Sequence, residues 1–351
     1  MTAKTDVVTK DGRATDGRAT LATVADAAGV SVATVSKVLN GRRDVAPATR
    51  ALVQDLLHSH DYVGRRVDPT RFPRVELLFH GDLNAYSTEI LQGVVSAGID
   101  PAVAVVVTQR PHGRQPRRPR PVVWASDLVA AGCQAVITVV NDLSPAEATA
   151  LAKARVPLVV IDPVNLPDAR VTSVGATNFS GALTATQHLL DLGHRRIAYL
   201  GGIAAAASNQ ARLQGYRGAM EAAAAPVPDG YVRTGNFIYQ DGLAEGTALL
   251  DLAEPPTAVF AASDEMALGV IEAARVRGLR VPEDLSVVGF DDTQLARLAS
   301  PPLTTVRQPL REIGAIALQR ALRLAAGEKV DSHHIELATE LIVRGSTASA
   351  R

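Results

Sequence analysis

The sequence predicts an N-terminal all-α helix-turn-helix head followed by an α/β core of two doubly wound parallel-sheet subdomains. A glycine interrupts a short helical segment near residue 30, and the rest of the chain alternates short apolar runs with amphipathic stretches. The chain has 351 residues, 47% of them hydrophobic, enough for two or three packed domains. Aromatic residues make up only 4%, so we expect cores built mainly from Ala, Val and Leu.

The head is predicted from residues 21–40, LATVADAAGVSVATVSKVLN. Apolar residues at helical spacing precede Gly29, and Ser31 can cap a second helix by accepting a hydrogen bond from the N–H of Ala33 or Thr34. Pro47 is predicted to start a third helix. Helix, glycine turn and capped helix form the arrangement whose second helix enters the DNA major groove. The residues predicted to face inward are Leu21, Val24, Ala25, Ala28, Val35, Val38, Leu39, Val53, Leu56 and Leu57.

Candidate DNA contacts lie at the start of the second helix and on both sides of it. Apolar atoms of Val32 and Ala33 can touch a thymine methyl group, and Lys37 can donate to guanine. Nearby hydroxyls and arginines can donate to phosphates. The alternative is a three-helix bundle with no role on DNA. The predicted contact residues are Thr20, Ser31, Val32, Ala33, Thr34, Ser36, Lys37, Asn40, Arg42, Arg43, Arg65 and Arg66.

Apolar runs of strand length begin at Val75 and continue through the rest of the chain. The predicted strands are Val75–Phe79, Val103–Val107, Ala135–Val140, Leu158–Ile161, Ile197–Leu200, Ala258–Ala261, Leu285–Phe290 and Ile335–Val343. The helical stretches predicted between them include Ser87–Ala97, Ser180–Leu192, Arg212–Ala223 and Asp264–Arg277. Each run has the length of a strand buried on both faces, and the alternation predicts parallel sheets with right-handed crossovers.

We expect a disordered tail over residues 1–19, a DNA-binding head over 20–64, a hinge or linker over 65–74 and a core over 75–347. Within the core, we assign about 75–162 and 292–325 to a first subdomain. We assign about 163–291 and 326–347 to a second.

The Pro- and Arg-rich segment 108–121 is predicted to be an exposed loop. The C-terminal segment Gly345–Arg351 has no apolar heptads, so we do not expect a coiled coil there.

The stretch TLATVADAAGVSVATVSKVLNG, followed by DVAPATR, resembles the DNA-binding segment of LacI/GalR-type transcription regulators. The later motifs ASDEMALGV, VPEDLSVVGFDD and PPLTTVRQP resemble that family's effector-binding core. The resemblance extends from about Thr20 to Thr347. It implies a periplasmic-binding-protein-like core of type I, a homodimer and a near-palindromic double-stranded DNA operator.

The predicted hinge departs from that family's pattern. The family's hinge typically forms a short helix whose leucine wedges into the minor groove. Residues 65–73, RRVDPTRFP, contain no leucine, and their two prolines restrict a helix. Val67 or Phe72 could replace the leucine, with arginines entering the minor groove. An extended tether with diffuse phosphate contacts is an equal alternative.

Polar and aromatic side chains follow several predicted strands, where doubly wound sheets bind ligands. Carboxylates, amides and arginines can hydrogen-bond to sugar hydroxyls, and an aromatic ring can cover a pyranose. The resemblance implies that effector contacts come from Ser208, Arg212, Phe237, Ser263, Asp291 and Gln308. The other predicted ligand-binding residues are Asp82, Tyr86, Asp162 and Asp264.

Structural roles compete with ligand binding at several of these positions. Asp264 could instead cap the helix that follows it. A surface salt bridge is the alternative for Arg212, and core packing is the alternative for Phe237. Trp124 is predicted to pack its own helix.

Several classes of protein are disfavoured. The sequence shows no phosphate-binding glycine loop, no nucleophile elbow and no clustered metal ligands, so we expect no enzyme, cofactor or metal. Cys133 is the single cysteine and is predicted to be a small buried hydrophobe. His333 and His334 are expected in a solvated loop. No apolar run approaches the length of a membrane span, and the N-terminus does not resemble a secretory signal.

These features together predict a cytoplasmic, sequence-specific transcription regulator. We expect a homodimeric repressor of carbohydrate-utilisation genes, switched by a sugar or glycoside bound between the two core subdomains. The formal charge is zero, with 36 Lys and Arg against 36 Asp and Glu, so the whole chain has no overall attraction to nucleic acid or membrane, although residues 1–66 carry ten Lys and Arg against seven Asp and Glu. A stand-alone sugar-binding protein is the rival that the helix-turn-helix segment disfavours.

Overall fold

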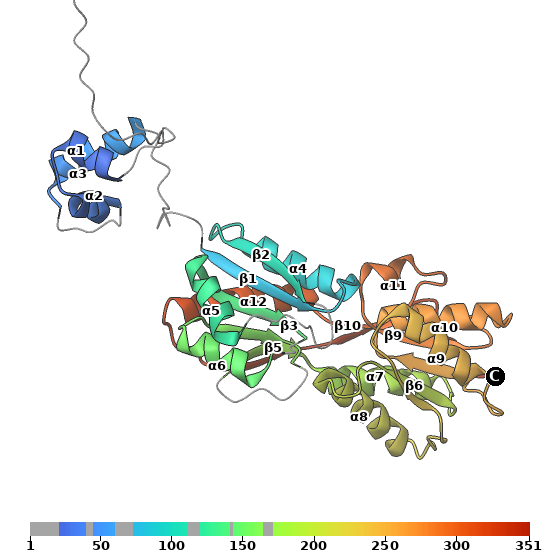
Figure 1. Ribbon diagram of the computed structural model, residues 1–351. Coiled ribbons are helices and arrows are strands. Elements are labelled where there is room, and N and C mark those ends of the chain that lie inside the picture. The colour runs from blue at the N-terminus through green and yellow to red at the C-terminus, as the bar shows by residue number, and fades with distance from the viewer. Residues whose placement is uncertain (1–20, 40–44, 60–72, 111–119, 141–142, 164–170) are drawn as a thin grey trace, which may run out of the picture. The chain divides into compact units, whose positions relative to one another are not determined.

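The computed structural model describes residues 21–39, 45–59, 73–110, 120–140, 143–163 and 171–351. The chain divides into two compact units, residues 1–71 and 72–351, and each is described by itself (Figure 1). Several predictions lie outside the described residues. They concern the tail, nearly all of the hinge, and the contact residues Thr20, Asn40, Arg42, Arg43, Arg65 and Arg66.

The first unit contains three short helices: α1 (Leu21–Ala28), α2 (Val32–Leu39) and α3 (Pro47–Ser59). The chain bends by 101° between α1 and α2, at Gly29, whose φ of 64° is the left-handed conformation that glycine adopts without strain. The N–H of Thr34 donates to Oγ of Ser31 at 3.1 Å, which confirms the predicted cap. The buried side chains are Val24, Ala25, Val35, Val38, Val53 and Leu57, all of them predicted.

Within the described ranges, no single helix is long and apolar enough to cross a bilayer. The pair α1 and α2 reaches the required length and hydropathy only when both are counted across their bend. The apolar side chains of α1 and α2 pack with those of α3 in one buried cluster. Packing within the head therefore accounts for their hydropathy.

The first sheet of the second unit has the strand order β11-β5-β4-β3-β1-β2, and every neighbouring pair is parallel. Its strands are β1 (Arg74–His80), β2 (Ala104–Arg110), β3 (Cys133–Val139), β4 (Leu158–Ile161), β5 (Thr172–Ala176) and β11 (His334–Leu337). The helices around it are α4 (Ala85–Ala97), α5 (Pro121–Ala130), α6 (Pro145–Lys153) and α12 (Leu310–Ala325).

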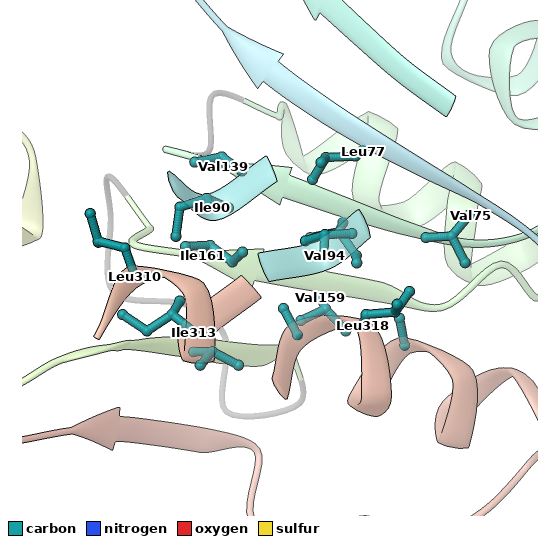
Figure 2. Packing of buried hydrophobic residues seen from close by; sticks show 14 of the residues in the cluster. Val75, Leu77, Ile90, Val94, Val139, Val159, Ile161, Leu310, Ile313 and Leu318 are labelled. Carbon is teal, nitrogen blue, oxygen red and sulfur yellow. The ribbon is translucent and has the colours of Figure 1, made fainter. Parts of the chain in front are cut away.

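Alternate residues of the first sheet pack on opposite faces. Ala135, Ile137 and Val139 of β3 join the cluster that contains α4 and α12, as Figure 2 shows for Val139. Val136 instead packs with α5 and α6, as does Cys133, which precedes a register shift at the start of β3. Because successive side chains of a strand point to opposite faces, the two helix pairs cover the two sides of this sheet.

The second sheet has the strand order β12-β10-β9-β8-β6-β7, with β12 antiparallel to β10 and the other pairs parallel. Its strands are β6 (Ile197–Gly201), β7 (Val232–Thr234), β8 (Ala258–Ala261), β9 (Ser286–Asp291), β10 (Thr304–Arg307) and β12 (Glu340–Ile342). One face packs against α7 (Asn178–Asp191) and α8 (Ala207–Ala222), and the other against α9 (Tyr239–Leu250) and α10 (Asp264–Val276). The short helix α11 (Gln294–Leu298) follows β9.

The chain crosses between the two sheets after β5, β10 and β11, in each case later than the predicted boundaries at about 163, 292 and 326. The strands β5 and β11 belong to the first sheet and β10 to the second, the reverse of the sequence assignment. The predicted strand Ile335–Val343 is two strands in different sheets, β11 and β12. The strands β5 and β10, which precede two of the crossings, were not predicted, so the boundaries were placed too early.

Other predictions meet mixed outcomes. Cys133 is buried and Trp124 packs beside the α5–α6 cluster, as predicted. His334 is exposed, as predicted, but it starts β11 rather than lying in a loop, and its Nδ1 lies 2.9 Å from Oγ of Ser173. The strand β2 is half-exposed rather than buried on both faces, because it forms an edge of its sheet, and it extends to Arg110 into the predicted loop.

Candidate functional site

The outer face of α2 carries the predicted DNA contacts. Val32, Ala33 and Lys37 are exposed, while Val35 and Val38 point into the head. Ser31 and Thr34 serve the helix as well, because their hydroxyl oxygens lie 2.9 Å apart beside the cap. The exposed face of α2 therefore carries the apolar side chains of Val32 and Ala33 at its start and the ammonium group of Lys37 about one turn later.

A polar cluster forms where the carboxyl ends of strands from both sheets meet. Asp162 follows β4, Asp291 ends β9, and Gln308 follows β10. The hydroxyl of Tyr86, in the first turn of α4, donates to Oδ2 of Asp162 at 2.5 Å. Nε2 of Gln308 donates to Oδ1 of Asp291 at 2.7 Å. The sequence predicted each of these residues, and the structure brings them together around Arg212.

Arg212 is held inside this cluster by neutral partners. Its side chain is 3% exposed, Nε donates to Oδ1 of Asn178 at 2.8 Å, and Nη1 donates to the carbonyl of Ala262 at 2.5 Å. The guanidinium lies 3.8 Å from the centroid of the Phe290 ring, a cation–π contact. The alternative of a surface salt bridge is therefore wrong, and Arg212 is a buried charge among carboxylates.

Burial sets the protonation behaviour of the cluster. Burial raises the pKa of Asp162, and the hydrogen bond from Tyr86 and the charge of Arg212 partly oppose this. Burial also raises the pKa of Asp291 well above its ordinary value, with Arg212 opposing and Asp264 reinforcing. The pKa of Tyr86 is raised by burial and by Asp162. A ligand that donates hydroxyl groups would stabilise both carboxylates in their charged form.

Three predicted ligand residues have unusual backbone geometry. Asp162, Phe237 and Asp291 have φ values of 45°, 66° and 116°, a region that residues other than glycine seldom adopt. Such conformations persist where the surrounding structure imposes them, and they gather at binding sites. The ring of Phe237 lies against Gly202, where an added Cβ would approach it to 2.2 Å. Phe237 is nevertheless partly exposed.

Ser263 and Asp264 both make hydrogen bonds within the core. Oγ of Ser263 accepts from the N–H of Met266 at 3.1 Å and donates to the carbonyl of Phe237 at 3.1 Å, so Ser263 caps α10. The alternative that Asp264 caps α10 is wrong, because Ser263 is the cap. Asp264 is fully buried and accepts hydrogen bonds from the N–H and hydroxyl of Thr293 and from the hydroxyl of Thr305. Its carboxylate joins α10 to Thr293 and to β10, and at 0% exposure it is not open to a ligand in this arrangement.

Asp82 lies apart from the polar cluster. It is exposed, and its Oδ1 lies 3.3 Å from Nε2 of Gln109 at the edge of the first sheet. The prediction that Asp82 contacts the ligand has no support in this arrangement.

Sequence reasoning missed two residues of this region. Asn178, the hydrogen-bond partner of Arg212, follows a strand that was not predicted. Glu265 accepts a hydrogen bond from the N–H of Ala85 at 3.1 Å and so joins α10 of one subdomain to α4 of the other. The motif carried Glu265, but its helical neighbours gave no sign of a partner 180 residues away.

A cavity of about 390 Å³ adjoins the cluster at Asp162. The residues that line it are Asp162, Pro163, Ser173, Val174, Gly175, Ala176, Thr177, Asn178, Phe179, Ser180, Ala207, Ser208, Ala211, His334, Ile335 and Glu336. They come from both subdomains, and of the predicted ligand residues only Asp162 and Ser208 are among them. In the part of the chain that the structure describes, no group of three or more His, Cys, Asp or Glu side chains could hold a metal ion.

A helix-turn-helix head joined to a two-sheet core with a ligand-sized cavity defines a ligand-responsive DNA-binding protein. Residues 20–64 match the model of bacterial regulatory proteins of the lacI family, and residues 186–347 match that of the periplasmic binding protein-like domain. Catabolite control protein A of Priestia megaterium is 30% identical over 333 residues, 93% of this chain and 99% of the relative. The chain therefore belongs to the lacI family.

Two solved structures are similar in fold and extent. One is the complex of the transcriptional regulator CelR with cellobiose, with a TM-score of 0.71 and 33% identity over 94% of this chain and all of that one. The other is the lac repressor dimer bound to operator and the anti-inducer ONPF. It also has a TM-score of 0.71, with 27% identity over 94% of this chain and 99% of that one. The similar proteins are transcriptional regulators rather than enzymes, and the predicted family and fold class are confirmed.

Proposed function

We propose that this protein is a homodimeric repressor of carbohydrate-utilisation genes whose affinity for its operator is set by a sugar or glycoside. The polar cluster is the observation that carries the proposal. Tyr86 and Asp162 come from one subdomain and Arg212 and Asp291 from the other, so one ligand can hydrogen-bond to both. The similar regulators bound to cellobiose and to operator DNA support the same assignment.

The head would bind DNA through α2. Val32 and Ala33 would meet thymine methyl groups and Lys37 a guanine, while Thr34 and Ser36 would donate to phosphates. Two heads in a dimer would require a near-palindromic operator. Operator binding takes place where the chromosome is, so we assign the protein to the cytoplasm.

The switch would be a difference in ligand affinity between two orientations of the core subdomains. A sugar that hydrogen-bonds to Asp162 and Asp291 together favours the orientation in which they lie close. The contact between Glu265 and the N–H of Ala85 belongs to the same orientation. A coupling free energy of about 1–3 kcal/mol between the sugar and operator sites would be typical.

Fluorescence anisotropy with promoter fragments, measured with and without sugars, tests both operator binding and its control by a sugar. Lys37→Met should weaken binding to the preferred fragment by about 1–3 kcal/mol and relax its sequence preference. The control Gln54→Ala, at an exposed position of α3, should bind like the unaltered protein. Equal affinity for every promoter fragment and for random DNA would contradict the proposal.

Asp291→Asn tests the sugar site separately. Asn keeps the size of Asp and can still accept from Gln308, but it loses a charged acceptor worth about 1.5–3 kcal/mol. We expect at least a tenfold loss of sugar affinity with operator affinity unchanged. Asp229→Asn, at an exposed position, is the matched control and should respond to sugar normally.

A further inference from the structure

Residues 345–350, here called the strap, cross the starts of two strands of the second sheet. Oγ of Ser346 donates to the carbonyl of Val287 in β9 at 2.6 Å and accepts from the N–H of Thr304 in β10 at 2.8 Å. The side chain of Ser346 is fully buried. The opposite ends of β9 and β10 reach the polar cluster, so the strap fixes the strands that position part of that cluster.

His194 holds the strap from the turn before β6, where it is 4% exposed. Its Nε2 lies 3.1 Å from the carbonyl oxygen of Ala348, and its Nδ1 lies 2.9 Å from Oγ1 of Thr257. Because a carbonyl oxygen can only accept, Nε2 of the neutral ring carries the proton and donates to Ala348, while Nδ1 accepts from Thr257. Oγ of Ser286 lies 3.0 Å from Nε2 and accepts from the N–H of Ala348 at 3.1 Å.

His188 adds a second contact from α7. Its Nε2 lies 3.0 Å from Oγ1 of Thr347, and this hydroxyl oxygen also lies 3.2 Å from Oγ1 of Thr304. His188 is half-buried. Two consecutive strap residues, Thr347 and Ala348, therefore each contact one imidazole ring.

Burial makes both rings resist protonation. It lowers the pKa of His194, with the hydrogen bond to Ala348 opposing and the charge of His188 reinforcing this shift. Burial also lowers the pKa of His188, and the charge of Asp191 opposes it. When the strap is released, both rings meet water and return toward their ordinary pKa of 6.5. The released state then binds more protons than the held state, so the strap is held above about pH 6.5 and loosens as the pH falls below it.

The charged side chains on the elements around the two rings are exposed. They are Asp191 on α7, Arg217 and Glu221 on α8, Arg195 and Arg196 before β6, Glu254 before β8, Glu283 and Asp284 before β9, and Arg351 after the strap. Arg344, which precedes the strap, donates to Asp292 at 2.5 Å. Within the described residues, the hydrogen-bond partners of both rings are hydroxyl and carbonyl oxygens. A buried imidazolium with such neutral partners is costly, because burial removes its hydration.

We propose that the strap is a pH-sensitive fastening of the second subdomain, which protonation of His188 and His194 releases from the starts of β9 and β10. Both rings contact the same short segment, so two protons act on one release step. The two imidazolium charges also repel each other, which favours release further. The proposal concerns the end of the sheet away from the ligand region and does not depend on which ligand binds.

Hydrogen exchange of the full-length protein, measured by mass spectrometry between about pH 5 and 7.5, tests the proposal. The reporters are the N–H groups of Ala348 and Ala350, which donate to Oγ of Ser286 and to the carbonyl of Leu192. Dividing each rate by the rate of an unstructured peptide at the same pH gives the protection of each amide. One ring raises release up to tenfold for each pH unit between its two pKa values, so we expect strap protection to fall at least about tenfold in acid.

The amides of α12 serve as the internal control and should change less than about twofold over this range. Constant protection of the strap from about pH 7.5 to 5 would overturn the proposal. An equal loss of protection in α12 would overturn it too, because the whole subunit would then be loosening rather than the strap alone.

Glutamine variants identify the titrating groups. The amide of Gln can still donate to Ala348 or Thr347 but takes up no proton in this range. The double variant His188→Gln with His194→Gln should keep its strap protection in acid, and His188→Gln alone, at a half-buried position, should lose less protection than the unaltered protein. His334→Gln is the matched control at an exposed position of β11 and should lose protection as the unaltered protein does. A full acid loss in His188→Gln and in the double variant would show that these histidines do not control the strap.

Discussion

At the scale of single residues, the sequence located charged groups better than it assigned their partners. Asp162, Arg212 and Asp291 were predicted from their places after strands or on a helix face, and they meet in one cluster. Ser263 and Asp264 are adjacent and both can cap a helix, so sequence alone could not decide between them. The structure decides through Thr293 and Thr305, distant side chains that occupy the oxygens of Asp264.

Asp264 should make stability depend on pH. Burial raises its pKa from 3.8 to about 7. Between these values the folded state binds more protons than the unfolded state, so this group's contribution to stability falls as pH rises from about 4 to 7. Asp264→Asn removes the titration, and its amide can still accept from Thr293 and donate to Thr305.

Urea unfolding at several pH values between 4.5 and 6.5 measures this contribution. The free energy of unfolding of Asp264→Asn should fall less steeply with pH than that of the unaltered protein. The difference should reach at most about 1.4 kcal/mol per pH unit, the value for one proton. Asp229→Asn is exposed and should keep the original slope. Identical slopes for Asp264→Asn and the unaltered protein would rule out this carboxyl as the source.

At the scale of helices and strands, the elements with a clear apolar or capping pattern in the sequence were predicted, and those without one were missed. The strands β1, β4 and β8 are short apolar runs and were found from sequence. The strands β5 (TSVGA) and β7 (VRT) were missed because they are short and carry polar residues or glycine. Their pairing depends on neighbours distant in the chain. The second helix of the head was predicted with its cap because Gly29 and Ser31 specify its start locally.

Ser31→Ala tests how much that cap contributes to the stability of α2. Losing the hydrogen bond to the N–H of Thr34 should cost about 1 kcal/mol of helix stability. Hydrogen exchange of the α2 amides in the full-length protein should become severalfold faster, and operator affinity should fall. Ser31→Thr retains a capping hydroxyl and should stay close to the original exchange rates. Unchanged exchange in Ser31→Ala would show that the cap does not hold α2.

At the scale of the whole molecule, the two proposed binding regions lie in different compact units. The helix α2, which carries the predicted DNA contacts, belongs to residues 1–71, and the polar cluster belongs to residues 72–351. The sequence predicted this division, because the head has its own apolar pattern. It placed the crossings between the two core sheets too early, because the strands β5 and β10 that precede two of them were not predicted. The ligand region lies near these crossings, where Asn178 and Gln308 follow β5 and β10, so a change in the orientation of the subdomains would alter it directly.

If a sugar changes operator affinity by some factor, operator DNA must change sugar affinity by the same factor, because the two binding equilibria form a closed cycle. We expect a factor of about 5–150, corresponding to about 1–3 kcal/mol. Anisotropy titrations of operator with and without saturating sugar give one value. Calorimetric titrations of sugar with and without saturating operator give the other. In Asp291→Asn, titrated at sugar concentrations below its weakened dissociation constant, the sugar should leave operator affinity unchanged. A factor of one in both directions for the unaltered protein would show that its sugar site does not control its binding to DNA.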